Sequence, residues 1–242
     1  MKVLIKLAVF CVLFVLVLIL RFPYDALVER SVRRAESSTG ATIIYQPVSA
    51  GPLGVRVNDL QINMPSGAAI RFDSARIFPT TSGLRVTAKQ KDNEMKATVS
   101  PTTLDLDLTS ITVETGSEGI GEATATGTLH YKMAAREGEG QLRLVIPELK
   151  LPLPIPDPSM EIGSSYTIRN VGTPQQPRTA VSAEVKLLNK DITANGTVSM
   201  EGQPPPSRPL INGNLSFDAP TGQGTLQLGG TWDKPSIKLN PK

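Results

Sequence analysis

Few residues of this sequence have side chains suited to catalysis or metal binding. The chain of 242 residues contains one histidine, His130, and one cysteine, Cys11. A structural zinc site needs four ligands and a catalytic one three, and a nucleophilic site needs a base beside a serine or cysteine. Cys11 lies inside an apolar run, so a nucleophilic site would have to use His130. We therefore expect a protein that is not an enzyme and that has no cofactor and no metal.

The remaining polar candidates favour exposed strand positions over a site. Asp105 and Asp107 alternate with three leucines on one predicted strand. Two such carboxylates can take part in acid-base catalysis or bind Ca²⁺, but no third ligand is near them in the sequence. His130 is expected to point outward from its own strand. Asn195 and Asn214 begin glycosylation sequons, which matter only in a eukaryotic secretory route.

The charge is distributed unevenly along the chain. Residues 1–36 carry six basic and three acidic side chains, whereas residues 37–242 carry 19 of each sign. The main domain is thus balanced, and nucleic-acid binding needs a dense basic surface that neutralises phosphates. Aromatic residues make up only 5% of the chain, which is few for stacking on bases. Nucleic acid is not an expected partner.

The N-terminal segment has the composition of a membrane anchor. Residues Val3–Leu20 are apolar except for Lys6, and eighteen residues are about the minimum for crossing a bilayer. No small-x-small cleavage site follows Leu20, so we expect an uncleaved anchor at residues 1–21 instead of a signal peptide. The basic residues on the two sides are nearly equal in number. The orientation therefore rests on the short N-terminal tail staying in the cytosol, with the rest exported.

A short helix is expected at residues 22–40. Pro23 suits the first helical position, where its missing N–H costs nothing. Val28, Val32 and Ala35 continue a narrow apolar stripe at helical spacing. We expect this juxtamembrane helix to lie on the lipid surface or to close one end of the following sheet.

From Ala41 the apolar residues recur with period two, which predicts strands over the domain at residues 41–242. The alternation shifts at Asn58-Asp59 and at Thr109-Ser110, and such shifts are typical of β-bulges. The prolines from Pro147 to Pro156 predict an edge strand or an extended arm, because proline cannot donate to a sheet. Two related Gly-x-Leu segments, 125–144 and 211–228, predict two similar hairpins.

The expected fold is mainly β: a transmembrane helix, a short amphipathic helix, and a long, curved antiparallel sheet. An amphipathic sheet must cover its apolar face, so the sheet is either an open groove covered by a lipid or partner, or a closed barrel or sandwich. The candidates for this apolar trough or core share one face of each predicted strand. They are Leu104, Leu106, Leu108, Leu142, Leu144, Ile146, Val181, Val185 and Leu187.

Two terminal segments carry a resemblance to known proteins. The sequence Arg21–Leu27, directly after the anchor, resembles the start of the type II secretion system protein N family, and Thr39–Ala41 and Gly51–Val55 fit the same opening. The sequence Leu228–Ile237 is similar to the closing strands of that family and of the wider AsmA-like group of bacterial envelope proteins.

This resemblance implies a single-pass protein of the bacterial inner membrane with a periplasmic β domain. The implied role is a non-catalytic scaffold, an accessory component of type II protein secretion. The implied partners are the inner membrane and other secretion-system or envelope proteins. The alternative is a lipid-binding or lipid-transfer protein, either AsmA-like or like the single-span jellyroll protein of lipopolysaccharide export, with lipid acyl chains as partners. The family supplies no catalytic residues.

Overall fold

The computed structural model describes residues 24–51, 53–117, 120–148, 159–173, 178–190, 192–202, 209–220, 222–231 and 234–241. The anchor expected at residues 1–21 lies outside these ranges, and so do residues 149–158, which hold most of the proline-rich run. Within these ranges no helix is both long enough and apolar enough to span a membrane.

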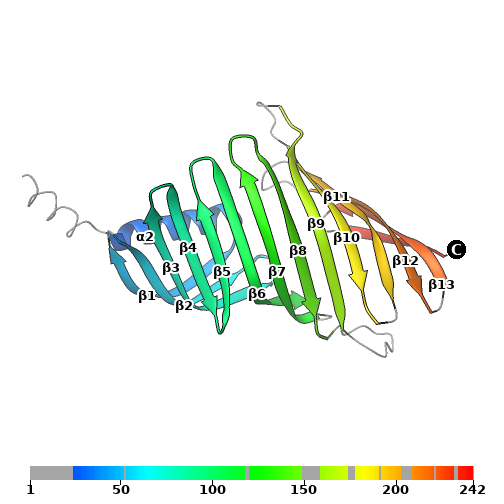
Figure 1. Cartoon of the computed structure of the whole chain (residues 1–242), viewed down its shortest axis with the longest axis horizontal. Coiled ribbons are helices and arrows are strands. Elements are labelled where there is room, and N and C mark those ends of the chain that lie inside the picture. Colours follow the sequence, from blue (N-terminus) through cyan, green and yellow to red (C-terminus); the bar gives the residue numbers. More distant parts are fainter. Residues whose placement is uncertain are drawn as a thin grey trace, which may run out of the picture.

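Fourteen strands form one antiparallel sheet in which each strand pairs with its neighbours along the chain (Figure 1). The prediction of a mainly β chain with one short helix before a long sheet is confirmed. β1 and β14 are the two ends of the strand order, so the sheet is open, and the closed-barrel alternative is wrong. The elements are α2 (Tyr24–Thr39), β1 (Thr42–Gly51), β2 (Gly54–Asn63), β3 (Ala69–Thr80), β4 (Gly83–Gln90), β5 (Asn93–Val99), β6 (Thr103–Ser117), β7 (Ile120–Lys132), β8 (Glu137–Ile146), β9 (Met160–Asn170), β10 (Thr179–Leu188), β11 (Thr193–Gly202), β12 (Leu210–Ala219), β13 (Gly222–Thr231) and β14 (Lys234–Pro241).

Helix α2 packs against β1 and ends in a glycine cap. The apolar stripe is seen as half-buried Val28, Val32 and Ala35. Gly40 has a φ of 70°, and its N–H donates to the carbonyl of Glu36 at 2.8 Å. This left-handed cap ends the helix and turns the chain into β1.

The cross-strand register separates the sheet into two faces. Leu106 lies opposite Leu129, and the same row continues through Gly140 and Tyr166 to Ala183. We call the face that carries this row the inner face. Because side chains alternate along a strand, the residues between them point to the other side. We call that side the outer face, which carries Asp105, His130, Glu139, Thr167 and Ser182.

The N-terminal part of the sheet curls onto its own inner face. The start of β3 pairs with the end of β6, with Ala69 opposite Glu114. This second pairing joins β3, β4, β5 and β6 in a ring, and Phe72 and Ile111 are buried inside it, at 3% and 2% exposed. We call strands β2–β6 the closed region and strands β7–β13 the open region.

A bulge and a glutamine make this curl possible. The predicted shift at Thr109-Ser110 is confirmed: Ser110 has a φ of 53°, and the β6–β7 register slips there. The bulge lies where β6 changes its partner from β5 to β3. We call the place where β6 changes partner the fork, and the side-chain amide of Gln90 bridges it. Its Nε2 donates to the carbonyls of Arg71 (2.8 Å) and Thr112 (3.0 Å), and its Oε1 accepts from the Thr112 N–H (2.6 Å).

The other local predictions agree with the structure except in detail. Asp59 has a φ of 49°, and two residues of β2 oppose one of β1 there, as the alternation predicts. The β4–β5 turn is formed by Lys91-Asp92, between the paired Gln90 and Asn93. The two related segments do form hairpins, β7–β8 and β12–β13, but their registers differ by two residues.

Candidate functional site

All nine apolar candidates lie on the inner face. One row across β6 to β10 consists of Leu108, Gly127, Leu142, Ser164 and Val185, each of which lies opposite the next. Neighbouring rows hold the other candidates in the same way. The nine are Leu104, Leu106 and Leu108 on β6, Leu142, Leu144 and Ile146 on β8, and Val181, Val185 and Leu187 on β10.

The inner face of the open region is not a closed core. Ile146 is buried, at 3% exposed, but the other eight candidates are only half-buried. Among the described residues, no helix or second sheet packs against this face in the open region; from β7 onward each strand contacts chiefly its two neighbours. The partial burial therefore comes from adjacent side chains of the curved sheet itself, and an aliphatic surface is left for something else to cover.

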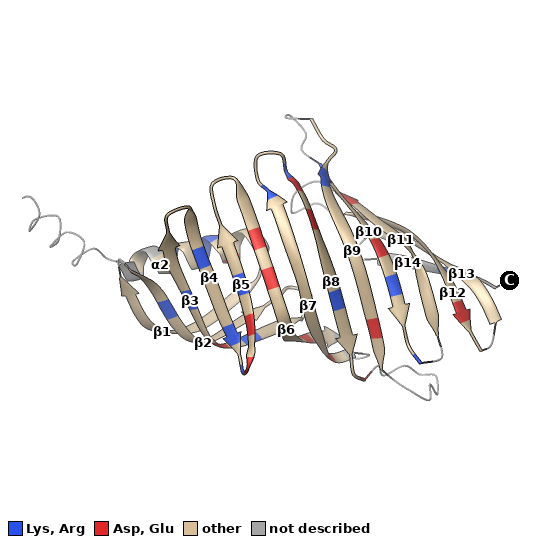
Figure 2. Cartoon of the chain, viewed as in Figure 1, with Lys and Arg blue, Asp and Glu red and all other residues tan. Residues whose placement is uncertain are grey.

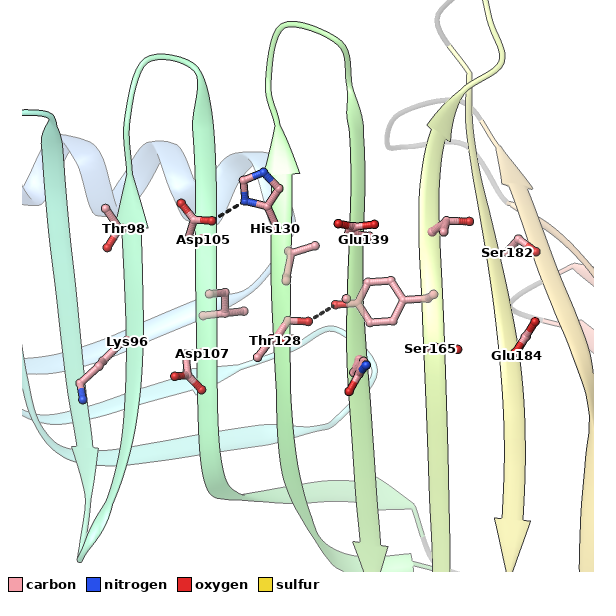
Figure 3. Close-up of a pocket in the computed structure, with 16 residues that line it drawn as sticks. Lys96, Thr98, Asp105, Asp107, Thr128, His130, Glu139, Ser165, Ser182 and Glu184 are labelled. Atoms are coloured by element: carbon pink, nitrogen blue, oxygen red, sulfur yellow. Dashed lines mark hydrogen bonds and ion pairs between the residues drawn. The ribbon is translucent and has the colours of Figure 1, made fainter.

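Aromatic rings and glycines shape this surface. Tyr166 of β9 lies across Gly140 of β8, where an added Cβ would be 2.5 Å from the tyrosine oxygen. The hydroxyl of Tyr166 donates to the carbonyl of Thr128 on β7 at 3.1 Å (Figure 3). Phe217 covers Gly224 in the same manner. A flat ring that lies over a glycine fills the space left by the missing side chain, so no two large side chains face each other at these positions.

The outer face carries a shallow polar hollow of about 690 Å³ over β5–β10 (Figure 3). His130 points outward there, as expected, with 44% of its side chain exposed, and its Nδ1 lies 2.5 Å from the Oδ1 of Asp105. On the other neighbouring strand Glu139 lies opposite His130. Carboxylates thus face the ring from both sides, whereas a nucleophilic site needs a hydroxyl or thiol at the second ring nitrogen. The geometry is that of a cross-strand ion pair.

The other polar candidates also lie on this outer surface. Asp107 is exposed in the hollow. Asn195 and Asn214 are exposed in the middle of β11 and β12. Within the described ranges no three His, Cys, Asp or Glu side chains are placed to hold a metal ion, and Cys11 lies outside those ranges.

Glu161 and Tyr166 are among the groups in or beside the hollow whose pKa is shifted. Arg143 binds Glu161 with two bonds of 2.7 Å, and these hydrogen bonds lower the pKa of the Glu161 carboxyl. Burial raises the pKa of the Tyr166 phenol. The first shift reflects the ion pair with Arg143, and the second favours the neutral phenol on the inner face.

The sequence interpretation missed a strand of the inner face. It made no prediction for β9, whose Ile162 and Tyr166 join the β8 and β10 candidates into one surface. The signal was present as alternation from Met160 to Ile168, but Gly163, Ser164 and Ser165 interrupt it.

Comparison of the chain with protein-family models, with curated proteins and with solved structures finds no match.

Proposed function

We propose that this protein binds lipid acyl chains along the inner face of its open region, as a non-catalytic protein of the bacterial envelope. The observation that supports this most directly is the uncovered aliphatic row of Leu144, Ile162 and Leu187, which lie opposite one another on β8, β9 and β10. Soluble monomers rarely expose a continuous apolar surface of this kind without a ligand or partner to cover it.

The energetics favour a lipid as the cover. Removing apolar surface from water contributes about 25 cal/mol per Å², or about 0.8 kcal/mol for each buried CH₂ group. An acyl chain lying along the inner face would bury its own methylenes and the half-exposed leucines together. Because the sheet is open, the polar headgroup can stay in water while the chain is covered.

The sequence around the domain suits such a role. An anchor at residues 1–21 and a helix at 22–40 would hold the sheet beside a bilayer, which is both its site of attachment and its source of lipid. We propose a single-pass location in the inner membrane with the sheet in the periplasm, with the inner membrane and other envelope proteins as partners.

The second candidate is an accessory scaffold of type II protein secretion. Its support is the resemblance of Arg21–Leu27 and Leu228–Ile237 to the protein N family. In that role the inner face would be covered by a protein partner, so the chemistry of whatever lies on the face distinguishes the two candidates.

Photo-crosslinking in cells tests the proposal with matched neighbours. A photoreactive residue at Leu142 or Val185 would point along the inner face, and one at Gln141 or Glu184, the preceding residues, would point to the outer face. We expect lipid adducts, identified by mass spectrometry, at the two inner positions only. Protein adducts at the inner positions would favour the scaffold. No adduct at any position would contradict both candidates, because each requires a lipid or a protein to lie on the inner face.

A further inference from the structure

The charges on the outer face are separated into two patches (Figure 2). The domain as a whole is balanced, but Lys and Arg predominate on the outer face over β2–β5, whereas Asp and Glu predominate over β6–β10, where Arg143 and Lys186 also lie. The basic patch comprises Arg56, Arg76, Arg85, Lys89 and Lys96, and the acidic patch comprises Asp105, Asp107, Glu139 and Glu184.

Within the basic patch, two arginines face each other across neighbouring strands. Arg56 of β2 lies directly opposite Arg76 of β3. Like charges in this arrangement destabilise a sheet. On the next row Lys89 of β4 lies opposite Ser74. These side chains, together with Thr87 and Glu94, line a hollow of about 480 Å³.

The described residues supply no carboxylate within ion-pair distance of Arg56, Arg76 or Lys89. Other cations of the sheet are paired, as Arg143 is with Glu161 at 2.7 Å. The one carboxylate in the hollow, Glu94, is bound by Lys96 at 2.7 Å. Arg56 and Arg76 therefore lie beside hydroxyl-bearing residues with no carboxylate among the described residues within ion-pair distance, at a cost that an anion would relieve. Lys89 lies opposite Glu94 of β5, which Lys96 already binds, so it can also contribute to binding an anion.

We propose that Arg56, Arg76 and Lys89 form a binding site for a phosphate group. A guanidinium presents paired N–H groups that match two phosphate oxygens, and the two opposed arginines can bind one phosphate together. The hydroxyls of Ser74 and Thr87 are further donors at the floor of the hollow. The site lies at the end of the sheet that follows α2, nearest the expected anchor, which favours an anionic lipid headgroup over free phosphate.

The neighbouring acidic patch sets the size of the ligand. Asp105 and Asp107 lie on β6, two strands beyond Lys89 of β4, so a long polyanion that extended in this direction would be repelled. Nucleic-acid binding needs many phosphate contacts along an extended surface. The site therefore suits one or two phosphates. It does not depend on acyl binding, because the two sites are on opposite faces.

The test uses the full chain in neutral detergent and two fluorescent lipids with identical acyl chains, phosphatidylglycerol and phosphatidylcholine. The variant is Arg56→Gln/Arg76→Gln. The matched control is Arg169→Gln/Lys186→Gln, which removes the same charge from the outer face of the open region. Binding is followed by fluorescence polarisation, and folding by circular dichroism. Identical chains make any preference a property of the headgroup and leave acyl binding out of the comparison.

We expect the wild-type and control proteins to prefer phosphatidylglycerol by about tenfold, as for a charge-assisted pair of hydrogen bonds, and the Arg56/Arg76 variant to lose that preference. If millimolar inorganic phosphate abolishes the preference, the site takes free phosphate; if not, it needs the headgroup. The proposal is overturned if the variant keeps the preference, if the control loses it equally, or if the wild type has none. If the double variant does not fold, Lys89→Gln is used in its place and should likewise lose the preference for phosphatidylglycerol.

Discussion

The closed and open regions have the same sequence pattern but differ in how far their inner faces are buried. In both, aliphatic residues alternate with polar ones, and the aliphatic side chains share the inner face. In the closed region Phe72, Ala75, Ala88 and Ile111 are all at most 4% exposed and form one cluster. In the open region the face remains mostly half-buried, and buried residues such as Leu215 are separated along the sheet.

The difference comes from a long-range pairing and not from composition. β3 binds β6 as well as β2 and β4, and this ring places the inner face of β6 against that of β2. No equivalent pairing joins the described strands of the open region. An amphipathic strand thus provides a face that can be covered, and the topology decides whether the chain covers it or leaves it to a ligand.

Truncation of the closed core should have the largest effect on stability. Phe72→Ala should lower the free energy of unfolding by about 3–5 kcal/mol, because it removes a buried ring and leaves a cavity. Leu142→Ala, in the open region, should cost only about 1 kcal/mol, since its side chain is already partly in water. Urea denaturation of the full chain in detergent, followed by far-ultraviolet circular dichroism, measures both. Equal losses would mean that the open face is also a packed core.

Loss of the Gln90 side chain should come next. Gln90→Ala leaves the backbone groups of Arg71 and Thr112 unpaired in the fork, at a cost of about 1–3 kcal/mol. Amide hydrogen exchange at Thr112 should become faster, because its N–H loses the Gln90 acceptor. Gln141→Ala, on the exposed outer face, is the control and should leave exchange unchanged. Unaltered exchange at Thr112 in the Gln90 variant would show that the fork is held by other contacts.

The local structure of both regions could be predicted from the sequence, and the pairing could not. Alternation gives the strands and their faces, and its interruptions give the bulges at Asp59 and Ser110. Nothing local tells that Ala69 meets Glu114, because the pairing joins residues 45 positions apart through a curl of the whole sheet. The role of Gln90 depends on that curl and is hidden with it.

The site shows the same division between local and long-range information. The nine aliphatic candidates follow from period two alone, and the registers bring them together on one face. The basic patch could not be predicted, because Arg56, Arg76 and Lys89 are evenly mixed with acidic residues along the chain and meet only through the β2–β3–β4 registers. A balanced sequence charge therefore says little about the charge of one face.

The Tyr166 hydroxyl should contribute a smaller amount in the open region. Tyr166→Phe removes its bond to the Thr128 carbonyl and should cost about 0.5–1.5 kcal/mol at neutral pH. Because the pKa of the phenol is raised in the folded protein, its contribution is complete below the ordinary tyrosine pKa and is lost as the pH rises through the folded value. Wild-type protein should lose more stability than the variant between neutral and strongly alkaline pH. Parallel losses would contradict a buried phenol.

Removal of the Arg143–Glu161 pair should have the smallest effect, because the Arg143 side chain is 60% and the Glu161 side chain 34% exposed, and water screens their attraction. The pKa of Glu161 is lowered by Arg143, so the pair contributes above the ordinary glutamate pKa and is lost as the pH falls through the folded value. Glu161→Gln should therefore be slightly less stable than wild type at neutral pH and equal to it in acid. A difference that persists in acid would point to packing instead of charge.

Cysteine accessibility tests the contrast between the two regions most directly. In a Cys11→Ser background, single cysteines replace Ala88 of the closed core, Ala183 of the open inner face and Ser182 of the outer face. The full chain is kept in neutral detergent without lipid and treated with a charged maleimide, with and without added fatty acid.

We predict that the cysteine at position 182 reacts under both conditions and that the one at position 88 reacts under neither. The cysteine at position 183 should react without fatty acid and become protected when it is added. A position 183 that never reacts would show a closed core, and one that reacts equally with and without fatty acid would show that no acyl chain binds there. Either result would contradict an open inner face that binds lipid.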